Sequence, residues 1–105
     1  MIEVRAAALA DLPAGAPLHV DAGSTPLCLV RVGDDVHAIA DVCTHQGGRL
    51  SGGKLSGHRL ACPRHGWMFD VRTGQCVFPP RGTAVARYPT RVDEAGVWVE
   101  ISSGS

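Results

Sequence analysis

The sequence predicts an all-β protein, on three observations. Short runs of β-branched and other apolar residues alternate with polar residues at a period of two, and clusters rich in Gly, Pro and Asp separate these runs. No stretch of useful length shows the 3.6-residue period of an amphipathic helix. No internal repeat suggests a solenoid or a propeller. We therefore expect a single small domain made of β-hairpins.

Length and composition support one globular domain. The chain has 105 residues, 45% hydrophobic and 19% charged, and no apolar run approaches the roughly 20 residues of a membrane span. Ten basic and ten acidic side chains cancel, which argues against nucleic-acid binding because phosphate neutralisation needs a basic excess. Residues 1–5 lack the features of a secretory signal. We expect a cytoplasmic protein with no membrane partner.

The first half of the chain predicts four strands. Residues 11–17 are rich in Pro and Gly and should form a loop between the first two strands, and Gly33-Asp34-Asp35 should turn the third strand into the fourth. The expected strands cover residues 2–8, 18–21, 27–32 and 36–40. Cys28, on the third strand, shares a face with Val30 and Val32, so we interpret it as a buried core thiol.

The second half predicts shorter strands. Gly57 and Gly74 should lie in turns, and Gly74 is free to adopt a positive φ. Pro79 and Pro80 cannot continue a ladder. The expected strands cover residues 54–57, 58–61, 68–71, 75–78, 84–92 and 97–101, the last two forming a hairpin that packs on the base of the molecule.

Two short motifs dominate the middle of the chain. The first is Cys43-Thr44-His45-Gln46-Gly47-Gly48, and the second is Cys62-Pro63-Arg64-His65-Gly66-Trp67-Met68-Phe69. Each supplies one thiol and one imidazole, and each follows an expected strand, which is a rigid way to hold ligands. Four such side chains predict a metal centre. A zinc site of this composition usually pairs Cys with Cys and His with His, whereas here unlike ligands are neighbours, which favours a cluster of two inequivalent irons.

These motifs, with Asp70-Val71-Arg72-Thr73-Gly74 after the second, resemble the two cluster loops of the Rieske family. The chain as a whole resembles the small Rieske-type ferredoxins of bacterial aromatic-ring oxygenase systems. The resemblance implies the Rieske fold over residues 1–105, with an antiparallel β-sandwich base and a cluster-binding subdomain at about 43–80. It implies one 2Fe-2S cluster, held by the thiolates of Cys43 and Cys62 on one iron and by His45 and His65 on the other.

The resemblance also implies how the site is tuned. The candidate hydrogen-bond donors to the sulfurs are the backbone N–H groups of Gln46, Gly47, Gly48, Gly66 and Trp67. Respiratory members of the family clamp their loops with a disulfide at the positions of Gly48 and Arg64, and they carry Ser and Tyr hydroxyls where this chain has Trp67 and Phe69. Without those hydroxyls we expect a potential at the low end of the Rieske range, about −150 mV.

The implied function is one-electron transfer without catalysis, from a flavin-dependent ferredoxin reductase to a terminal oxygenase in aromatic hydrocarbon catabolism. Docking should use the loop tips, and weak contacts would permit turnover. The expected docking residues are Gln46, Pro63, Arg64, Trp67 and Pro80, with Gly47, Gly66, Pro79 and Arg81 beside them.

Alternatives remain open at this stage. The chain could be the small Rieske-like subunit of an NADH-dependent nitrite reductase or, more remotely, a structural zinc module. Trp67 shields the cluster or only packs in the core. For Cys76 we expect packing on the same face as Phe78, for Asp70 a structural hydrogen-bonding role, and for His19, His37 and His58 no chemistry.

Overall fold

The computed structural model describes residues 2–12, 14–42, 49–63, 66–78 and 82–101. In these ranges antiparallel strands dominate, as the sequence predicts, and two 3-10 turns accompany them. The elements are β1 (Ile2–Ala7), η1 (Leu9–Asp11), β2 (Leu18–Ala22), β3 (Thr25–Val32), β4 (Asp35–Ala40), η2 (Leu50–Gly52), β5 (Lys54–Ser56), β6 (Arg59–Ala61), β7 (Met68–Asp70), β8 (Cys76–Phe78), β9 (Arg87–Tyr88), β10 (Thr90–Asp93) and β11 (Gly96–Ile101). None of the helical turns described is long and apolar enough to cross a membrane.

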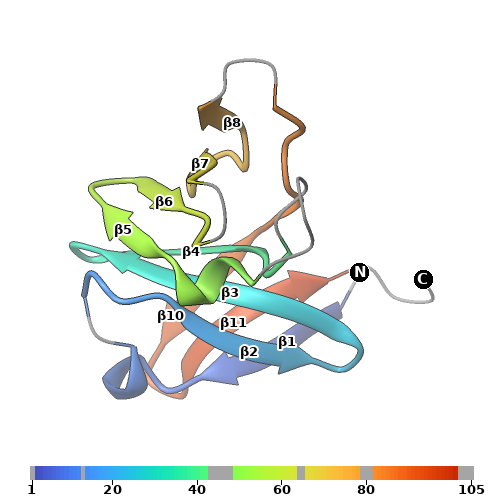
Figure 1. The fold of residues 1–105 in the computed structure, drawn as a ribbon. Coiled ribbons are helices and arrows are strands. Elements are labelled where there is room, and N and C mark those ends of the chain that lie inside the picture. Colours follow the sequence, from blue (N-terminus) through green and yellow to red (C-terminus); the bar gives the residue numbers. More distant parts are fainter. Residues whose placement is uncertain (1, 13, 43–48, 64–65, 79–81, 102–105) are drawn as a thin grey trace.

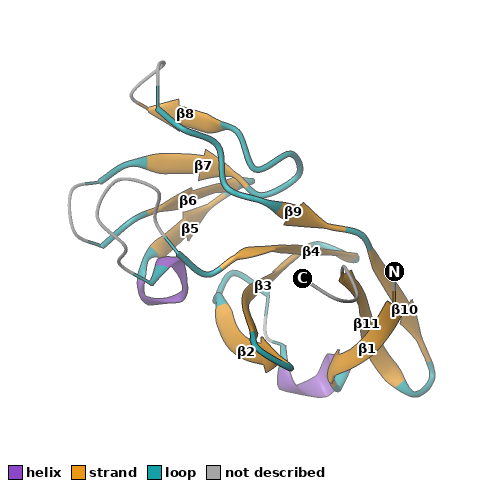
Figure 2. Ribbon diagram, turned by 90° about the vertical axis from the view of Figure 1, so that its right-hand side faces the viewer, coloured by secondary structure: helices purple, strands orange, loops and turns teal. Residues whose placement is uncertain are grey.

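The strands form three sheets. Sheet A has the order β1-β11-β10, sheet B the order β2-β3-β4-β9, and sheet C the order β5-β6-β7-β8. Sheets A and B curve around a common interior and form the base of the molecule, while sheet C lies on the opposite side of sheet B (Figure 1, Figure 2). The fold is therefore an antiparallel β-sandwich base with a small third sheet at one end.

The base encloses an aliphatic core, called here the basal core. It is lined by the inward faces of sheets A and B, with Leu12 beside them. Its buried members are Leu12, Ala22, Leu27, Leu29, Val36, Ala38, Val97, Val99 and Ile101. The final hairpin, β10–β11, packs on sheet B through this core, as expected, and β1 adds a third strand by pairing along β11.

A second core, called here the upper core, separates sheet B from sheet C. Its buried members are Cys28, Val30, Ile39, Leu50, Leu60, Cys62, Phe69, Val71 and Val85, with Val32, Leu55, Trp67 and Cys76 packed against them. Strand β3 is buried on both faces, since Cys28 and Val30 face the upper core while Leu27 and Leu29 face the basal core. The buried-thiol interpretation of Cys28 is thus confirmed.

Two expectations about strands need correction. The strand predicted over 84–92 is broken at Pro89, which cannot donate to a ladder, and the chain passes there from sheet B (β9) to sheet A (β10). Cys76 and Phe78 do not share an environment, because Cys76 packs on the upper core while Phe78 is 57% exposed. A bulge explains this difference, since Met68 pairs with Phe78 but the next residue pairs with Cys76.

Candidate metal centre

Cys62 is the one predicted ligand among the described residues. It follows β6, which is held on both sides, with Leu60 opposite Leu55 on β5 and Phe69 on β7. The Cys62 N–H donates to the carbonyl of Trp67 at 2.6 Å, and the Cys62 carbonyl accepts from the Gly66 N–H at 3.1 Å. Both bonds close the base of the second motif, so the backbone of Cys62 is fixed by sheet C and by its own loop.

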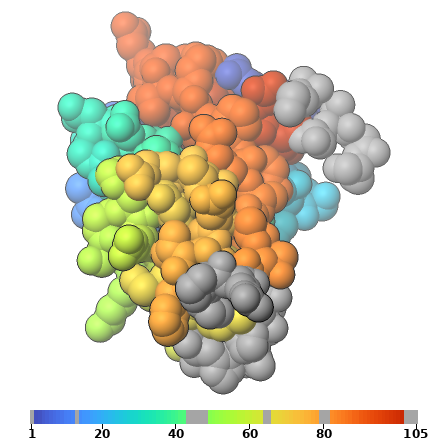
Figure 3. All heavy atoms as spheres, turned by 90° about the horizontal axis from the view of Figure 1, so that it is seen from above, coloured from blue at the N-terminus to red at the C-terminus, as the bar shows by residue number. Residues whose placement is uncertain are grey.

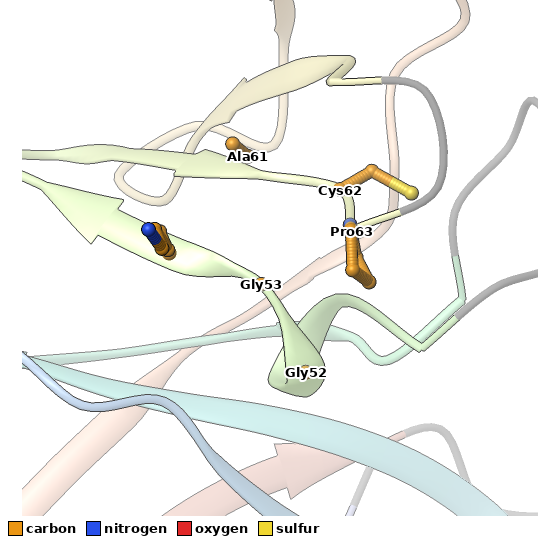
Figure 4. Close-up of a pocket in the computed structure, with 6 residues that line it drawn as sticks. Gly52, Gly53, Ala61, Cys62 and Pro63 are labelled. Atoms are coloured by element: carbon orange, nitrogen blue, oxygen red, sulfur yellow. The ribbon is translucent and has the colours of Figure 1, made fainter.

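The Gly66 N–H, a predicted donor to sulfur, is therefore used within the loop in this structure. It donates to the carbonyl of the ligand residue, and Gly66 adopts a φ of 73° that makes this close turn possible. The Cys62 residue is only 3% exposed. Figure 4 shows its side chain extending beyond the end of β6, with the sulfur pointing away from Ala61.

The chain entering β5 passes very close to the Cys62 strand. A Cβ placed on Gly53 would lie 1.8 Å from the carbonyl oxygen of Ala61, whereas one on Gly52 would meet only Pro63, at an ordinary 3.7 Å. This contact brings η2 and β5 beside Cys62 and Pro63, and the two segments line an open cavity of about 310 Å³ (Figure 4). Only glycine at position 53 allows the two segments to approach in this way.

Trp67 connects the second motif to the segment after β8. It is half-buried and packs against the upper core. A Cβ on Gly82 would lie 2.9 Å from Cζ3 of Trp67 and 2.2 Å from Sγ of Cys76. The indole therefore has a packing role, and the chain at Gly82 lies directly against it.

A buried carboxylate precedes the first motif. Asp41 follows β4, and its side chain has no solvent exposure. Its Oδ1 accepts the Ser51 N–H at 2.7 Å, while its Oδ2 accepts the Ser51 hydroxyl at 2.6 Å and lies 2.5 Å from Nδ1 of His19. Sequence reasoning missed Asp41 and Ser51 and assigned no chemistry to His19. The available signal was an acidic residue between an apolar strand and the first cysteine.

Most of the other predicted site residues lie outside the described ranges. These are the candidate ligands Cys43, His45 and His65, the candidate donors Gln46, Gly47 and Gly48, and the candidate docking residues Arg64 and Pro80. Within the described ranges no group of three or more His, Cys, Asp or Glu side chains is arranged to hold a metal ion. The ligand set thus stays a prediction, to which the structure adds the position of Cys62.

The other described thiols are not candidates for ligation. Burial raises the pKa of the Cys28 thiol far above its usual range, and the charge of Asp41 raises it further, so Cys28 stays protonated and inert. The Cys76 Sγ donates to the carbonyl of Phe78 at 3.3 Å. No disulfide joins Cys28 to Cys76 in the part of the chain that is described.

The remaining candidates have structural roles. Asp70 accepts hydrogen bonds from the backbone and guanidinium of Arg72, which lower its pKa, so the expected structural role is confirmed. The ring of His37, on β4, and the ring of His58, in the turn between β5 and β6, lie edge to face with centroids 6.0 Å apart. Burial is the main reason why the pKa of His37 is lowered, and its Nε2 is buried with no hydrogen-bond partner among the described residues.

The donor set fits an iron–sulfur cluster better than a zinc ion. A thiolate from each motif and an imidazole from each motif suit a cluster whose two irons differ. Cys62 supplies one thiol at a rigid strand end, where it is a buried member of the upper core and also lines the open cavity. Of the four predicted donors, the structure places Cys62, at the end of β6 in sheet C.

Comparisons with known proteins agree with this chemistry. A family model described as the Rieske [2Fe-2S] domain matches residues 3–89. The ferredoxin component of the naphthalene 1,2-dioxygenase system of Pseudomonas putida is 32% identical over 99 residues, covering 94% of this chain and 95% of that protein. The ferredoxin of carbazole 1,9a-dioxygenase from Nocardioides aromaticivorans IC177 superposes with a TM-score of 0.89 at 34% identity, covering 94% of this chain and 97% of that chain.

Other solved structures bear on the alternatives. A match of TM-score 0.86 and 35% identity, covering 93% of this chain and 92% of that chain, is to a complex of reduced oxygenase and oxidized ferredoxin in carbazole 1,9a-dioxygenase. Dicamba monooxygenase matches at 35% identity, but only 32% of that chain is covered. A nitrite reductase small subunit from Mycobacterium tuberculosis matches at 26% identity with a TM-score of 0.85, covering 96% of each chain.

Proposed function

The chain belongs to the Rieske [2Fe-2S] domain family, and we propose that it shuttles single electrons from a flavoprotein NAD(P)H reductase to a terminal Rieske non-haem iron oxygenase in aromatic-compound degradation. Its cofactor is one Rieske-type 2Fe-2S cluster. The observation that carries the proposal is the match over nearly the whole length of ferredoxin components, whereas an oxygenase chain is covered for only about a third. Such components transfer electrons and transform no substrate themselves.

Cys43 and Cys62 would hold one iron of the cluster, and His45 and His65 the other. The cluster supplies a reversible one-electron couple. The position of Cys62 supports this assignment, because β6 and two backbone hydrogen bonds fix it at the end of sheet C. Residues 43–80 would then be the cluster-binding subdomain of a single domain, which agrees with the position of sheet C on sheet B.

We expect a potential near the low end of the family's range. Neither Trp67 nor Phe69 carries a hydroxyl, and Phe69 is fully buried in the upper core. The backbone N–H groups of residues 46–48 and of Trp67 remain the candidate donors to sulfur. A low potential favours delivery of electrons to an oxygenase rather than oxidation of a quinol.

The docking face should surround the ligand loops. Pro63 is exposed and Trp67 half-buried, and two other apolar side chains are exposed: Val42, directly before the first motif, and Phe78, at the end of β8. Figure 3 views the molecule from the side of sheet C, whose strands and the segment after β8 (gold and orange) lie in the middle of the face. A small, partly apolar surface suits a short-lived contact with a reductase and an oxygenase.

The cytoplasm is the proposed location. Cys28 and Cys76 form no disulfide with each other, which is compatible with a reducing compartment. This placement could be tested by fractionating cells that express the chain with a tag. Recovery in the periplasmic fraction would contradict it.

The first experiment is spectroscopic. The protein, purified aerobically, should be red-brown and after dithionite reduction should give a rhombic EPR signal with an average g below that of all-cysteine 2Fe-2S ferredoxins. A colourless protein that binds one zinc and no sulfide after reconstitution would instead leave a structural zinc module.

The second experiment addresses the partners. NADH, a flavoprotein reductase and a terminal oxygenase from an aromatic dioxygenase system should form product only when this chain is added. The nitrite-reductase alternative rests on a neighbour of lower identity. It would be preferred if the chain co-purified with a large sirohaem subunit and failed to support any oxygenase.

A further inference from the structure

We propose that Asp41 is a positioning residue for the cluster, which anchors the first ligand motif through His19 and Ser51 and keeps the cluster potential low through its buried charge. This inference rests on the proposed function, because it assumes a cluster held by Cys43 and His45. The electron-carrier function alone does not explain why a carboxylate is buried here. Among the described residues, Asp41 is the one charged residue that is fully buried.

Asp41 connects the residues on either side of the first motif. It lies two residues before Cys43, and Ser51 lies three residues after Gly48, the last residue of that motif. The Ser51 N–H donates to Oδ1 at 2.7 Å and the Ser51 hydroxyl to Oδ2 at 2.6 Å, so one carboxylate holds Ser51 at two points. These two bonds therefore fix the chain that leaves the first motif to the chain that enters it.

The same carboxylate ties this closed segment to the base. Oδ2 also lies 2.5 Å from Nδ1 of His19 on β2, and the Asp41 N–H donates to the carbonyl of Pro26 on β3 at 3.1 Å. The other ring nitrogen of His19 contacts Asp21 at 3.1 Å, which orients the imidazole from the solvent side. Asp41, and with it Ser51, is thereby held to β2 and β3 of sheet B.

The cluster of Ser, Asp and His is not a hydrolytic site. In a catalytic triad the imidazole lies between the serine and the carboxylate, so that it can take the serine proton. Here the carboxylate lies in the middle, and Ser51 donates to Asp41 rather than to His19. The arrangement holds a carboxylate in place and activates no nucleophile.

Burial gives the charge of Asp41 an electrostatic consequence. An ionised carboxylate without solvent is costly unless it is fully hydrogen-bonded, and three partners on two oxygens meet that condition. Its charge is already felt in the upper core, where it helps raise the pKa of the Cys28 thiol. Reduction adds one negative charge to the cluster, so a fixed buried carboxylate near Cys43 makes reduction harder and lowers the potential.

The test compares three variants of the cluster-loaded protein with the unmodified protein. D41N removes the charge from a side chain of the same shape and size. D41E keeps the charge on a side chain that is one methylene group longer, and S51A removes the hydroxyl that donates to Asp41. The matched control is D93N. Asp93 is a carboxylate in sheet A that also accepts backbone N–H bonds, from Ala95 and Gly96, but lies in the base. The readouts are the midpoint potential by voltammetry and the rate at which a chelator bleaches the visible absorbance.

We expect D41N to raise the potential and to lose the cluster about tenfold faster, since bonds to a charged group are lost. D41E and S51A should lose the cluster faster with little change in potential, and D93N should match the unmodified protein in both readouts. If D41N does not load a cluster, D41E and S51A still test the anchoring. Unchanged loss rates in both of them would overturn it.

D41N could instead melt at a lower temperature while its midpoint potential and its rate of cluster loss stay unchanged, as in D93N. That result would show that Asp41 only stabilises the fold, and it would overturn the inference. That failure is distinct from failure of the proposed function. If the unmodified protein lacked the mixed Cys and His EPR signature, the proposed function would fall first, and this inference with it.

Discussion

The two cores on either side of sheet B differ in how they are closed. The basal core lies under strands of four to eight residues in β2, β3, β4, β10 and β11, so long ladders support its packing. The upper core is covered by sheet C, whose four strands have three residues each. Short strands contribute few ladder hydrogen bonds, so sheet C depends more on side-chain packing, on close glycine contacts and on the cluster.

This contrast suggests that the stability of the two cores depends on the cluster to different degrees. The base should fold as an aliphatic sandwich whether or not the cluster is present. The upper core, which contains Cys62 and Phe69, should be the part whose stability is coupled to cluster binding. The following variants test that difference between the two cores, from the largest expected effect to the smallest.

Replacing Cys62 by Ala should abolish the cluster while the base stays folded. The visible absorbance should disappear, and the far-UV circular dichroism should retain its β signal. The matched control is Cys28→Ala, which removes the other fully packed thiol of the upper core and should leave the absorbance per mole unchanged. A normal cluster content in Cys62→Ala would show that Cys62 is not a ligand.

Truncating one side chain in each core should separate the two cores. Phe69→Ala in the upper core should cost about 3–5 kcal/mol and Leu29→Ala in the basal core about 2–5 kcal/mol of the free energy of unfolding. Heating Phe69→Ala should bleach the cluster well before the base unfolds, because the lost packing lies under sheet C. In Leu29→Ala, the temperature of cluster bleaching and the temperature at which the circular dichroism signal is lost should fall by similar amounts. If the bleaching and unfolding temperatures differed by the same amount in both variants, the two cores would not be energetically separate.

The close approach beside Cys62 can be tested with neighbouring glycines. Gly53→Ala places a Cβ against the Ala61 carbonyl and should cost about 1–3 kcal/mol, with faster loss of the cluster. Gly52→Ala is the matched control, because its Cβ meets only Pro63 at an ordinary distance. Chemical unfolding and chelator challenge measure the two effects. Similar behaviour of the two variants would mean that the contact does not position Cys62.

The smallest effect should come from an exposed charge on the base. Hydrogen bonds from the indole of Trp98 and from Arg91 lower the pKa of Asp93 from its usual 3.8 to about 2. A carboxyl group whose pKa is lower in the folded than in the unfolded state stabilises the fold at pH values above the unfolded pKa. This contribution is lost as the pH falls from about 4 to about 2. Asp93→Asn should therefore melt slightly below the parent at neutral pH.

The difference between Asp93→Asn and its parent should vanish as the pH approaches 2. The Cys62→Ala background suits this measurement, because it carries no cluster that acid could dissolve. Melting followed by circular dichroism at several pH values would check it. A difference that persisted unchanged at pH 2 would mean that the Asp93 charge is not the cause.

Much of the fold could be predicted because the signals are local. The hairpin turn after β3 and the positive φ of Gly74, observed at 80°, follow from turn residues between apolar runs. The two motifs were equally readable, since a thiol and an imidazole two or three residues apart specify a ligand pair without any knowledge of the fold. Phe78 shows the limit, because a one-residue bulge in the β7–β8 pairing gives it a different environment from Cys76.

The sequence by itself determined the all-β class, the approximate strands and the mixed Cys and His motifs, because each depends on residues close together in the chain. Only the tertiary structure decided that β3 is buried on both faces and that β1 pairs along β11. It also brought His19, Asp41 and Ser51 together from β2, the end of β4 and η2. Their meeting depends on strand pairing and on burial of a charge, and neither leaves a periodic trace in the sequence.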